Sequence, residues 1–179
     1  MCGITAIFYT NKQNGLEIYE SLLSIQHRGQ DGAGIYAIAN NTINGVKNKG
    51  LISNLCSYED LTRMESKIYL AHTRYKTNDI VNSFQPFHLK NEFFNIIFCH
   101  NGNIINTFQI SQLLQSKFNV EPVENQSDSL LLFQLIFCFL SSYVDKEINT
   151  TLIVNLSNFL QSTLSGSFSI RLGIENYGL

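Results

Sequence analysis

Short apolar segments of strand length lie toward both ends of this chain, and a block of helical periodicity lies between them. Short continuous apolar runs indicate buried strands, whereas apolar residues three and four apart indicate amphipathic helices. The sequence thus predicts strands at 4–9, 34–39, 42–47, 67–73, 93–99 and 167–174. It predicts helices at 16–26, 58–66, 107–118, 128–143 and 150–164. Strands on both sides of a helical block are typical of an α+β layered domain.

Polar residues with strong turn preferences separate these segments. Asn40 and Asn41 predict a tight hairpin, and the His-Asn-Gly-Asn stretch at 100–103 predicts another turn. Residues 75–86 are polar and aperiodic, which indicates a loop. Asn106 or Thr107, and Ser127 or Asp128, are suitable helix N-caps.

Composition excludes several classes of function. A net charge of −2 gives no electrostatic basis for binding nucleic acid or an anionic membrane. The longest apolar run, 130–140, is shorter than the roughly 20 residues of a membrane span, and the N-terminus lacks a signal-peptide pattern. The four cysteines form no CxxC pair. We therefore expect a cytoplasmic protein without a metal site, cofactor or disulfide framework.

Cys2 is the first candidate catalytic residue. Removal of Met1 would leave a cysteine with a free α-amine, whose pKa of about 7.7–8.0 suits it to accept the proton of a thiol with a pKa of about 8.5. Nucleophile and general base would then share one residue. Taken by position alone, a packing cysteine is the commoner explanation.

Two stretches could line such a site. The glycine-rich segment 27–34 contains Arg28 and Gly29, and its spacing does not fit a phosphate-binding loop. Arg74 ends a predicted strand and could hold a carboxylate with two hydrogen bonds. The alternatives are a tight helix-to-strand connection and a solvent-facing charge.

Two further stretches add donors and an anion. Asn101 and Gly102 could hold an oxyanion with a side-chain amide and a backbone N–H. Asp128 opens a predicted helix, where a carboxylate commonly caps the helix and does nothing more.

The order of these stretches is more specific than any one of them. MCGI at the start, HRGQDGAGI, AHTRY, CHNGN, SDS before a helix and GSFSI follow one another along the chain. In this order the chain resembles the glutaminase part of class II glutamine amidotransferases. Within that class, HRGQD with KGLIS, RYKT and QPF resemble the amidophosphoribosyltransferases of purine synthesis.

The resemblance implies an N-terminal-nucleophile αββα sandwich spanning residues 1–179 and a role for each matching position. Cys2 would be the nucleophile, and Asn101 and Gly102 the oxyanion hole. The residues implied to bind or enclose glutamine are Arg74, Thr77, Asp128, Arg28 and Gly29.

The sequence also departs from this family. Relatives continue past the strand at 166–174, so we expect a sandwich truncated at its C-terminal strands, with an uncovered sheet edge through which it could oligomerise. No phosphoribosyltransferase signature is present, so ammonia would pass to water or to an acceptor subunit in trans. Thr77 lacks the glycine that commonly follows it in relatives.

Three hypotheses remain at this point. The first is a glutaminase that hydrolyses glutamine to glutamate and ammonia through a Cys2 thioester. The second is a non-catalytic remnant that binds glutamine or another protein. The third is an N-terminal-nucleophile hydrolase of another amide, which an Arg74–Asp128 clamp for a zwitterion disfavours. We assign packing or structural roles to the remaining cysteines and to three histidines: Cys56, Cys99, Cys138, His72, His88 and His100.

Overall fold

A computed structural model describes residues 2–75, 84–121, 126–143 and 147–178. The chain divides into two compact units, of which the first comprises residues 1–101 and 169–179 and the second residues 102–168. Two strands, β6 (Asn95–Ile104) and β7 (Gly166–Ile174), run from one unit into the other. The other elements of the first unit are β1 (Gly3–Gln13), α1 (Leu16–Ser24), β2 (Gly32–Ala39), β3 (Thr42–Lys49), α2 (Tyr58–Arg63), β4 (Ser66–Arg74) and β5 (Phe87–Lys90).

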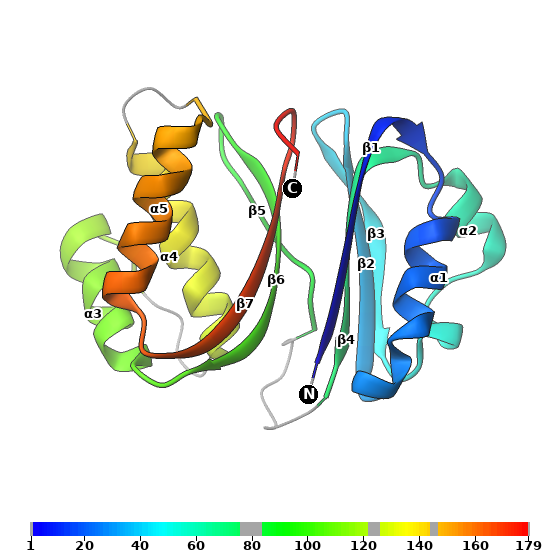
Figure 1. Ribbon diagram of the computed structural model, residues 1–179, viewed down its shortest axis with the longest axis horizontal. Helices are drawn as coiled ribbons and strands as arrows, with labels where there is room; N and C mark the ends of the chain where they lie inside the picture. The colour runs from blue at the N-terminus through cyan, green and yellow to red at the C-terminus, as the bar shows by residue number, and fades with distance from the viewer. Residues whose placement is uncertain (1, 76–83, 122–125, 144–146, 179) are drawn as a thin grey trace. The chain divides into compact units, whose positions relative to one another are not determined.

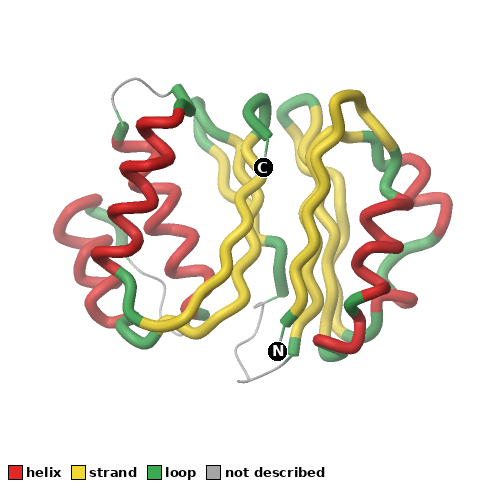
Figure 2. Tube along the Cα trace, viewed as in Figure 1, coloured by secondary structure: helices red, strands yellow, loops and turns green. Residues whose placement is uncertain are grey.

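A four-stranded antiparallel sheet forms the centre of the first unit (Figure 2). Its order is β1-β4-β2-β3, so β4 lies between the strand that begins the chain and the strand that follows the glycine-rich segment. The predicted hairpin between β2 and β3 is confirmed. Asn40 and Asn41 adopt φ angles of 53° and 63°, the left-handed conformation that a two-residue hairpin turn requires.

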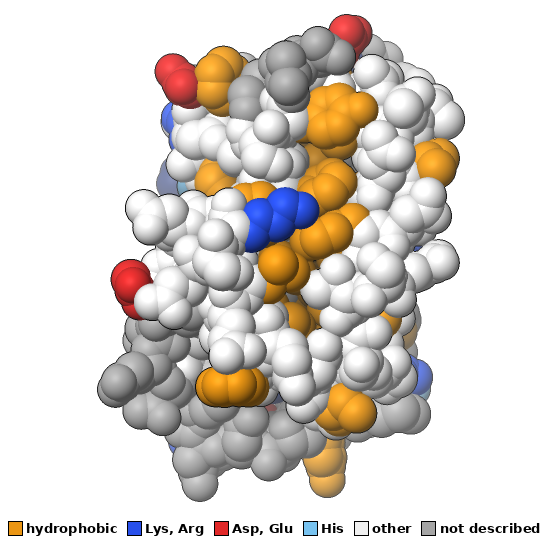
Figure 3. Space-filling model, turned by 90° about the vertical axis from the view of Figure 1, so that its left-hand side faces the viewer, with side chains coloured by type: hydrophobic (Ala, Val, Ile, Leu, Met, Phe, Trp, Pro, Cys, Tyr) orange, Lys and Arg blue, Asp and Glu red, His pale blue; other side chains and the backbone are white. Residues whose placement is uncertain are grey.

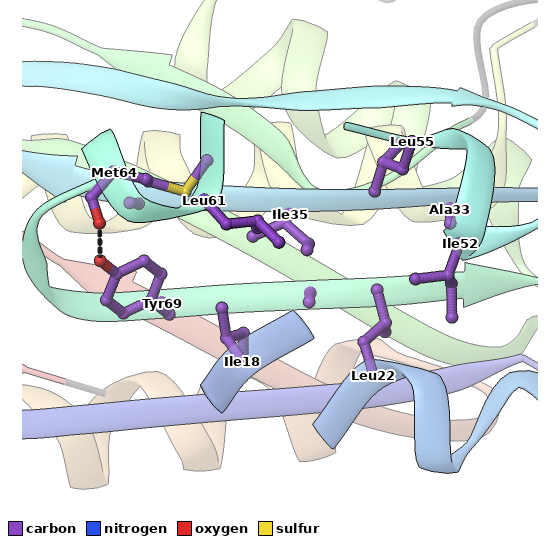
Figure 4. Close-up of a cluster of buried hydrophobic side chains, with 11 residues drawn as sticks. Ile18, Leu22, Ala33, Ile35, Ile52, Leu55, Leu61, Met64 and Tyr69 are labelled. Atoms are coloured by element: carbon purple, nitrogen blue, oxygen red, sulfur yellow. Dashed lines mark hydrogen bonds between the residues drawn. The ribbon is translucent and has the colours of Figure 1, made fainter. Parts of the chain in front are cut away.

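Helices α1 and α2 cover one face of this sheet with apolar side chains (Figures 1 and 4). Ile18 and Leu22, one helical turn apart on α1, are fully buried against the sheet. The Tyr69 hydroxyl crosses this layer and donates to the Met64 carbonyl, as Figure 4 shows. Such a layer excludes water and holds β4 in place.

The opposite face of the same sheet packs on the part of the second sheet that belongs to the first unit. That second sheet has the order β5-β6-β7. Successive residues of a strand point to opposite faces, so Ile68 and Leu70 of β4 lie on this side while Tyr69 lies under the helices. Ile97 and Cys99 of β6 complete the cluster. Because both of its faces are covered, β4 is buried along almost its whole length.

The second unit is built from three helices, α3 (Thr107–Phe118), α4 (Asp128–Ser142) and α5 (Thr150–Thr163). Ser127 caps α4 by accepting the Leu130 N–H, and Asn149 caps α5 in the same way. Figure 3 looks onto the side of these helices and shows apolar side chains gathered in a central strip. Among the described helices, none combines the length and apolar character needed to cross a bilayer.

Two predictions of local structure were wrong, and one strand was missed. Helix α2 ends at Arg63, and Ser66 already belongs to β4, where its hydroxyl bonds the Ile38 carbonyl. Residues 100–103 form no turn: β6 extends to Ile104 because β7 pairs alongside it and supplies partners for its backbone. Strand β5, which pairs with β6, was not predicted.

Candidate active site

The C-terminal end of β4 brings together chain segments that are distant in sequence. Antiparallel pairing places Gly3 of β1 opposite Thr73, and Gly32 of β2 opposite Arg74. Cys2, which directly precedes β1, therefore lies beside the end of β4. The proximity of these residues results from the register of a buried sheet and not from a flexible loop.

Cys2 is half-buried and held by backbone and side-chain contacts. The Tyr75 N–H donates to its sulfur at 3.4 Å, and the Arg28 Nε donates to its carbonyl at 3.0 Å. The next residue is fixed as well, because the Gly3 N–H donates to the Thr73 hydroxyl at 3.1 Å. The Cys2 sulfur also lies 3.8 Å from the Tyr75 carbonyl oxygen, so both backbone groups of Tyr75 hold it in place.

Arg28 and Gly29 follow α1 through a short 3-10 turn, Gln26–Arg28. Gly29 packs directly on the backbone of Arg74, since a Cβ at position 29 would lie 2.5 Å from the Arg74 carbonyl carbon. Any side chain here would displace the end of β4. The Asp31 N–H donates to the Arg74 carbonyl at 3.0 Å and closes the same junction.

Arg74 and His72 lie on the face of β4 that packs on the second sheet. Arg74 is 9% exposed, and its guanidinium lies 5.4 Å from the centre of the Phe84 ring. His72 is 1% exposed. Burial lowers the pKa of His72 to about 3, and the neighbouring Arg74 and His100 act in the same direction. A neutral imidazole therefore accompanies the buried guanidinium.

The other predicted site residues belong to the second unit, to its border, or to the undescribed part of the chain. Asn101 is half-buried in β6, and Gly102 follows it as the first residue of the second unit. Asp128 opens α4, where its Oδ2 accepts the Ile104 N–H at 3.0 Å, so its carboxylate ties this helix to the end of β6. Thr77 lies outside the described residues.

Proteins similar to this chain are amidophosphoribosyltransferases. The one from Methanocaldococcus jannaschii is 34% identical, over 82% of this chain and 31% of its own length. The one from Archaeoglobus fulgidus is 30% identical, over 98% of this chain and 37% of its own length. The solved glutamine phosphoribosylpyrophosphate amidotransferase from B. subtilis is 27% identical and gives a TM-score of 0.71, over 96% of this chain and 35% of that one.

The chain belongs to the class II glutamine amidotransferases. It spans about a third of the length of the relatives it matches. No protein-family model matches it. The family resemblance and the α+β fold class predicted from the sequence are both confirmed.

Two of the remaining cysteines lie in or against packed layers of the first unit. Cys56 packs against the helix-side core and Cys99 lies in the cluster between the sheets, as their predicted packing roles require. Burial raises the pKa of Cys99, and the nearby Lys47 ammonium opposes this effect. Among the residues that the structure describes, no group of His, Cys, Asp or Glu side chains could hold a metal ion.

Three contributors to this candidate site were not predicted from the sequence. The Tyr75 N–H and the Thr73 hydroxyl act through backbone register, which no motif reveals. Gln85 bonds the backbone of His100, although in the sequence it served only as part of a family marker. The role of Gln85 depends on its burial in the folded chain, where a polar group needs partners.

Proposed function

We propose that this chain hydrolyses glutamine to glutamate and ammonia through a γ-glutamyl thioester on Cys2. The observation that carries the proposal is the Tyr75 N–H directed at the Cys2 sulfur, beside a buried Arg74 on the same strand end. A nucleophile supported by a backbone donor and adjacent to a carboxylate-binding guanidinium suits an amino-acid amide as substrate. The relatives, whose names describe amidotransferases, support the same reaction class.

Removal of Met1, which precedes catalysis, frees the α-amine of Cys2. This amine takes the thiol proton, and the thiolate attacks the δ-carbonyl carbon of glutamine. The oxyanion that forms is held by the Asn101 side chain and the Gly102 N–H. Ammonia then leaves with the proton from the α-ammonium. Finally the amine activates a water molecule, which hydrolyses the thioester, releases glutamate and regenerates the thiol.

Binding of glutamine requires one cation and one anion for its zwitterionic end. We assign Arg74 to the α-carboxylate, with Thr77 near it, and Asp128 to the α-ammonium. One Asp128 oxygen already accepts the Ile104 N–H, which fixes the direction of the carboxylate. Arg28 and Gly29 form the wall beside Cys2, in keeping with the Arg28 bond to the Cys2 carbonyl.

The ammonia is passed on for the synthesis of a phosphoribosylamine, as the names of the relatives suggest. The chemistry of that step needs a phosphoribosyl acceptor site, which we assign to a partner subunit or domain. We further propose that the chain assembles with this partner, or with a second copy, through the edge of its β5-β6-β7 sheet.

Intact-mass spectrometry before and after treatment with a diazo-ketone analogue of norleucine tests the proposal. We expect loss of Met1 and a single adduct that maps to Cys2 and is absent from Cys2→Ala. Ammonia release from glutamine should be lost in the same variant. A folded protein that retains Met1, or that forms no adduct, would contradict the glutaminase and support a non-catalytic glutamine-binding module.

A further inference from the structure

The side chain of Gln85 takes the place of a missing strand residue beside β6. Strand β5 pairs with β6 from Lys90 opposite Asn95 to Phe87 opposite Phe98. Continuing this register by two residues places Gln85 opposite His100. The intervening Pro86 has no backbone N–H, so it cannot continue the ladder as a donor.

The Gln85 amide replaces both backbone bonds that a strand residue would make to His100. Its Nε2 donates to the His100 carbonyl at 3.1 Å, and its Oε1 accepts the His100 N–H at 2.6 Å. Gln85 is 5% exposed, so these are buried bonds without competition from bulk water. Loss of the amide would remove both of these bonds from the buried His100 backbone, which is costly.

The segment that carries Gln85 is itself held in place. Gly34 of β2 packs against it so closely that a Cβ there would lie 2.3 Å from the Gln85 carbonyl oxygen. The Lys47 ammonium donates to the Pro86 carbonyl at 3.0 Å while lying 5.3 Å from the centre of the Tyr36 ring and 5.2 Å from that of Phe87. The amide therefore reaches His100 from a fixed position.

His100 directly precedes Asn101, to which we assigned the oxyanion. Strand alternation puts Asn101 on the same side of β6 as Ile97 and Cys99, the side that packs on β4. The direction of the Asn101 side chain thus depends on the backbone position at His100. We propose that Gln85 is a positioning residue for the oxyanion hole, acting through its paired bonds to the His100 backbone. This inference rests on the proposed glutaminase reaction.

Steady-state kinetics of glutamine hydrolysis by Gln85→Met tests this role. Methionine has nearly the shape of glutamine but makes neither bond. We expect kcat to fall by about tenfold to a hundredfold, less than the loss of an oxyanion donor itself. KM should stay within about threefold, because glutamine is held by groups other than Gln85. A kcat within about twofold of wild type would overturn the proposal.

Gln85→Asn separates hydrogen bonding from packing and serves if the methionine variant folds poorly. Asparagine is smaller than methionine but keeps an amide that can restore one of the two bonds. We expect kcat in the order wild type, Asn, Met. The order wild type, Met, Asn would show that Gln85 only fills space. Gln109→Met, the same change at an exposed position on α3, is the control and should retain the kcat of wild type.

Hydrogen exchange distinguishes failure of this inference from failure of the proposed function. In Gln85→Met we expect faster exchange at the His100 amide, with protection kept at β4. If wild type releases no ammonia from glutamine, the proposed reaction is wrong, and the exchange result still shows whether Gln85 holds His100. Unchanged exchange at His100 would overturn the inference whatever the activity.

Discussion

The two faces of β4 are both buried, yet they contain different chemistry. The face under α1 and α2 is filled mainly by apolar side chains, and the Tyr69 hydroxyl on this face is hydrogen-bonded. The face toward the second sheet begins in the same way with Ile68 and Leu70. At the C-terminal end of β4, the same face carries the polar residues His72 and Arg74, which lie near Cys2.

This difference shows that the polar end of β4 lowers the stability of the fold. Burying a guanidinium and an imidazole costs desolvation free energy that an aliphatic pair would not incur. The apolar face stabilises the sheet and offsets that cost. If this division holds, changes on the helix-side face should alter stability and spare turnover, while changes at the polar end should do the reverse.

Arg74→Met gives the largest expected effect. Loss of two charge-assisted hydrogen bonds to the α-carboxylate should lower kcat/KM for glutamine by about a hundredfold to a thousandfold, mainly through KM. Arg74→Lys should recover part of this loss, because it keeps the charge without the planar fork. Steady-state kinetics of both Arg74 variants would measure these changes. Arg171→Met, at an exposed arginine on β7, is the control. A KM equal to that of wild type would contradict the role of Arg74 in binding glutamine.

Leu22→Ala tests the apolar face. Leu22 is fully buried on α1, and its truncation should lower the free energy of unfolding by about 3 kcal/mol. The adjacent Leu23 is 45% exposed, so Leu23→Ala is a matched control with an expected change below about 1 kcal/mol. Urea unfolding measures both. A large loss of kcat in folded Leu22→Ala would break the proposed division between the two faces.

The protonation of His72 gives a smaller, pH-dependent effect. Its pKa is about 3 in the folded protein against 6.5 for an unperturbed histidine, so between these values the unfolded chain binds a proton that the folded chain does not. Its contribution to stability is thus present above pH 6.5 and is lost progressively as the pH falls toward 3. From pH 7 to pH 5 this loss is about 2 kcal/mol.

Unfolding curves of His72→Gln at both pH values check this expectation. The variant should lose about 2 kcal/mol less than wild type over the same interval, whatever its stability at pH 7. His27→Gln, which removes an exposed imidazole before β2, is the matched comparison. Equal pH dependence in His72→Gln and wild type would show that the pKa of His72 is the same in the folded and the unfolded chain.

The same contrast explains which features could be predicted from the sequence. The Asn40–Asn41 hairpin and the N-cap of α4 depend on neighbouring residues; the hairpin was predicted, and the cap was predicted as Ser127 or Asp128. Residues 100–103 have turn-forming composition, but strand β7, more than 60 residues later, pairs with them and keeps them extended. Propensity is a weak guide where a distant strand supplies the hydrogen bonds.

The candidate site shows the same limit. Cys2 and Arg74 could be named from their motifs, because their chemistry is visible in their residue types. The donors around them could not, since the Tyr75 N–H acts through its place in the sheet and Gln85 through a side chain that imitates a strand. Register and burial, which require the folded chain, decide such contacts.

Ser57→Ala, on the helix-side layer, gives the smallest expected effect. The Ser57 hydroxyl accepts the Asp60 N–H at 3.1 Å, and the Asp60 carboxylate accepts the Ser57 N–H at 2.9 Å, a capping box that starts α2. Its loss should lower the free energy of unfolding by about 1 kcal/mol. Ser53→Ala, at an exposed position before α2, is the control. Because α2 contributes Leu61 to the apolar face and nothing to the polar end, kcat and KM for glutamine should equal those of wild type. A change in either constant would show that strain on the helix-side face reaches the site through β4, and the two faces would then act as one.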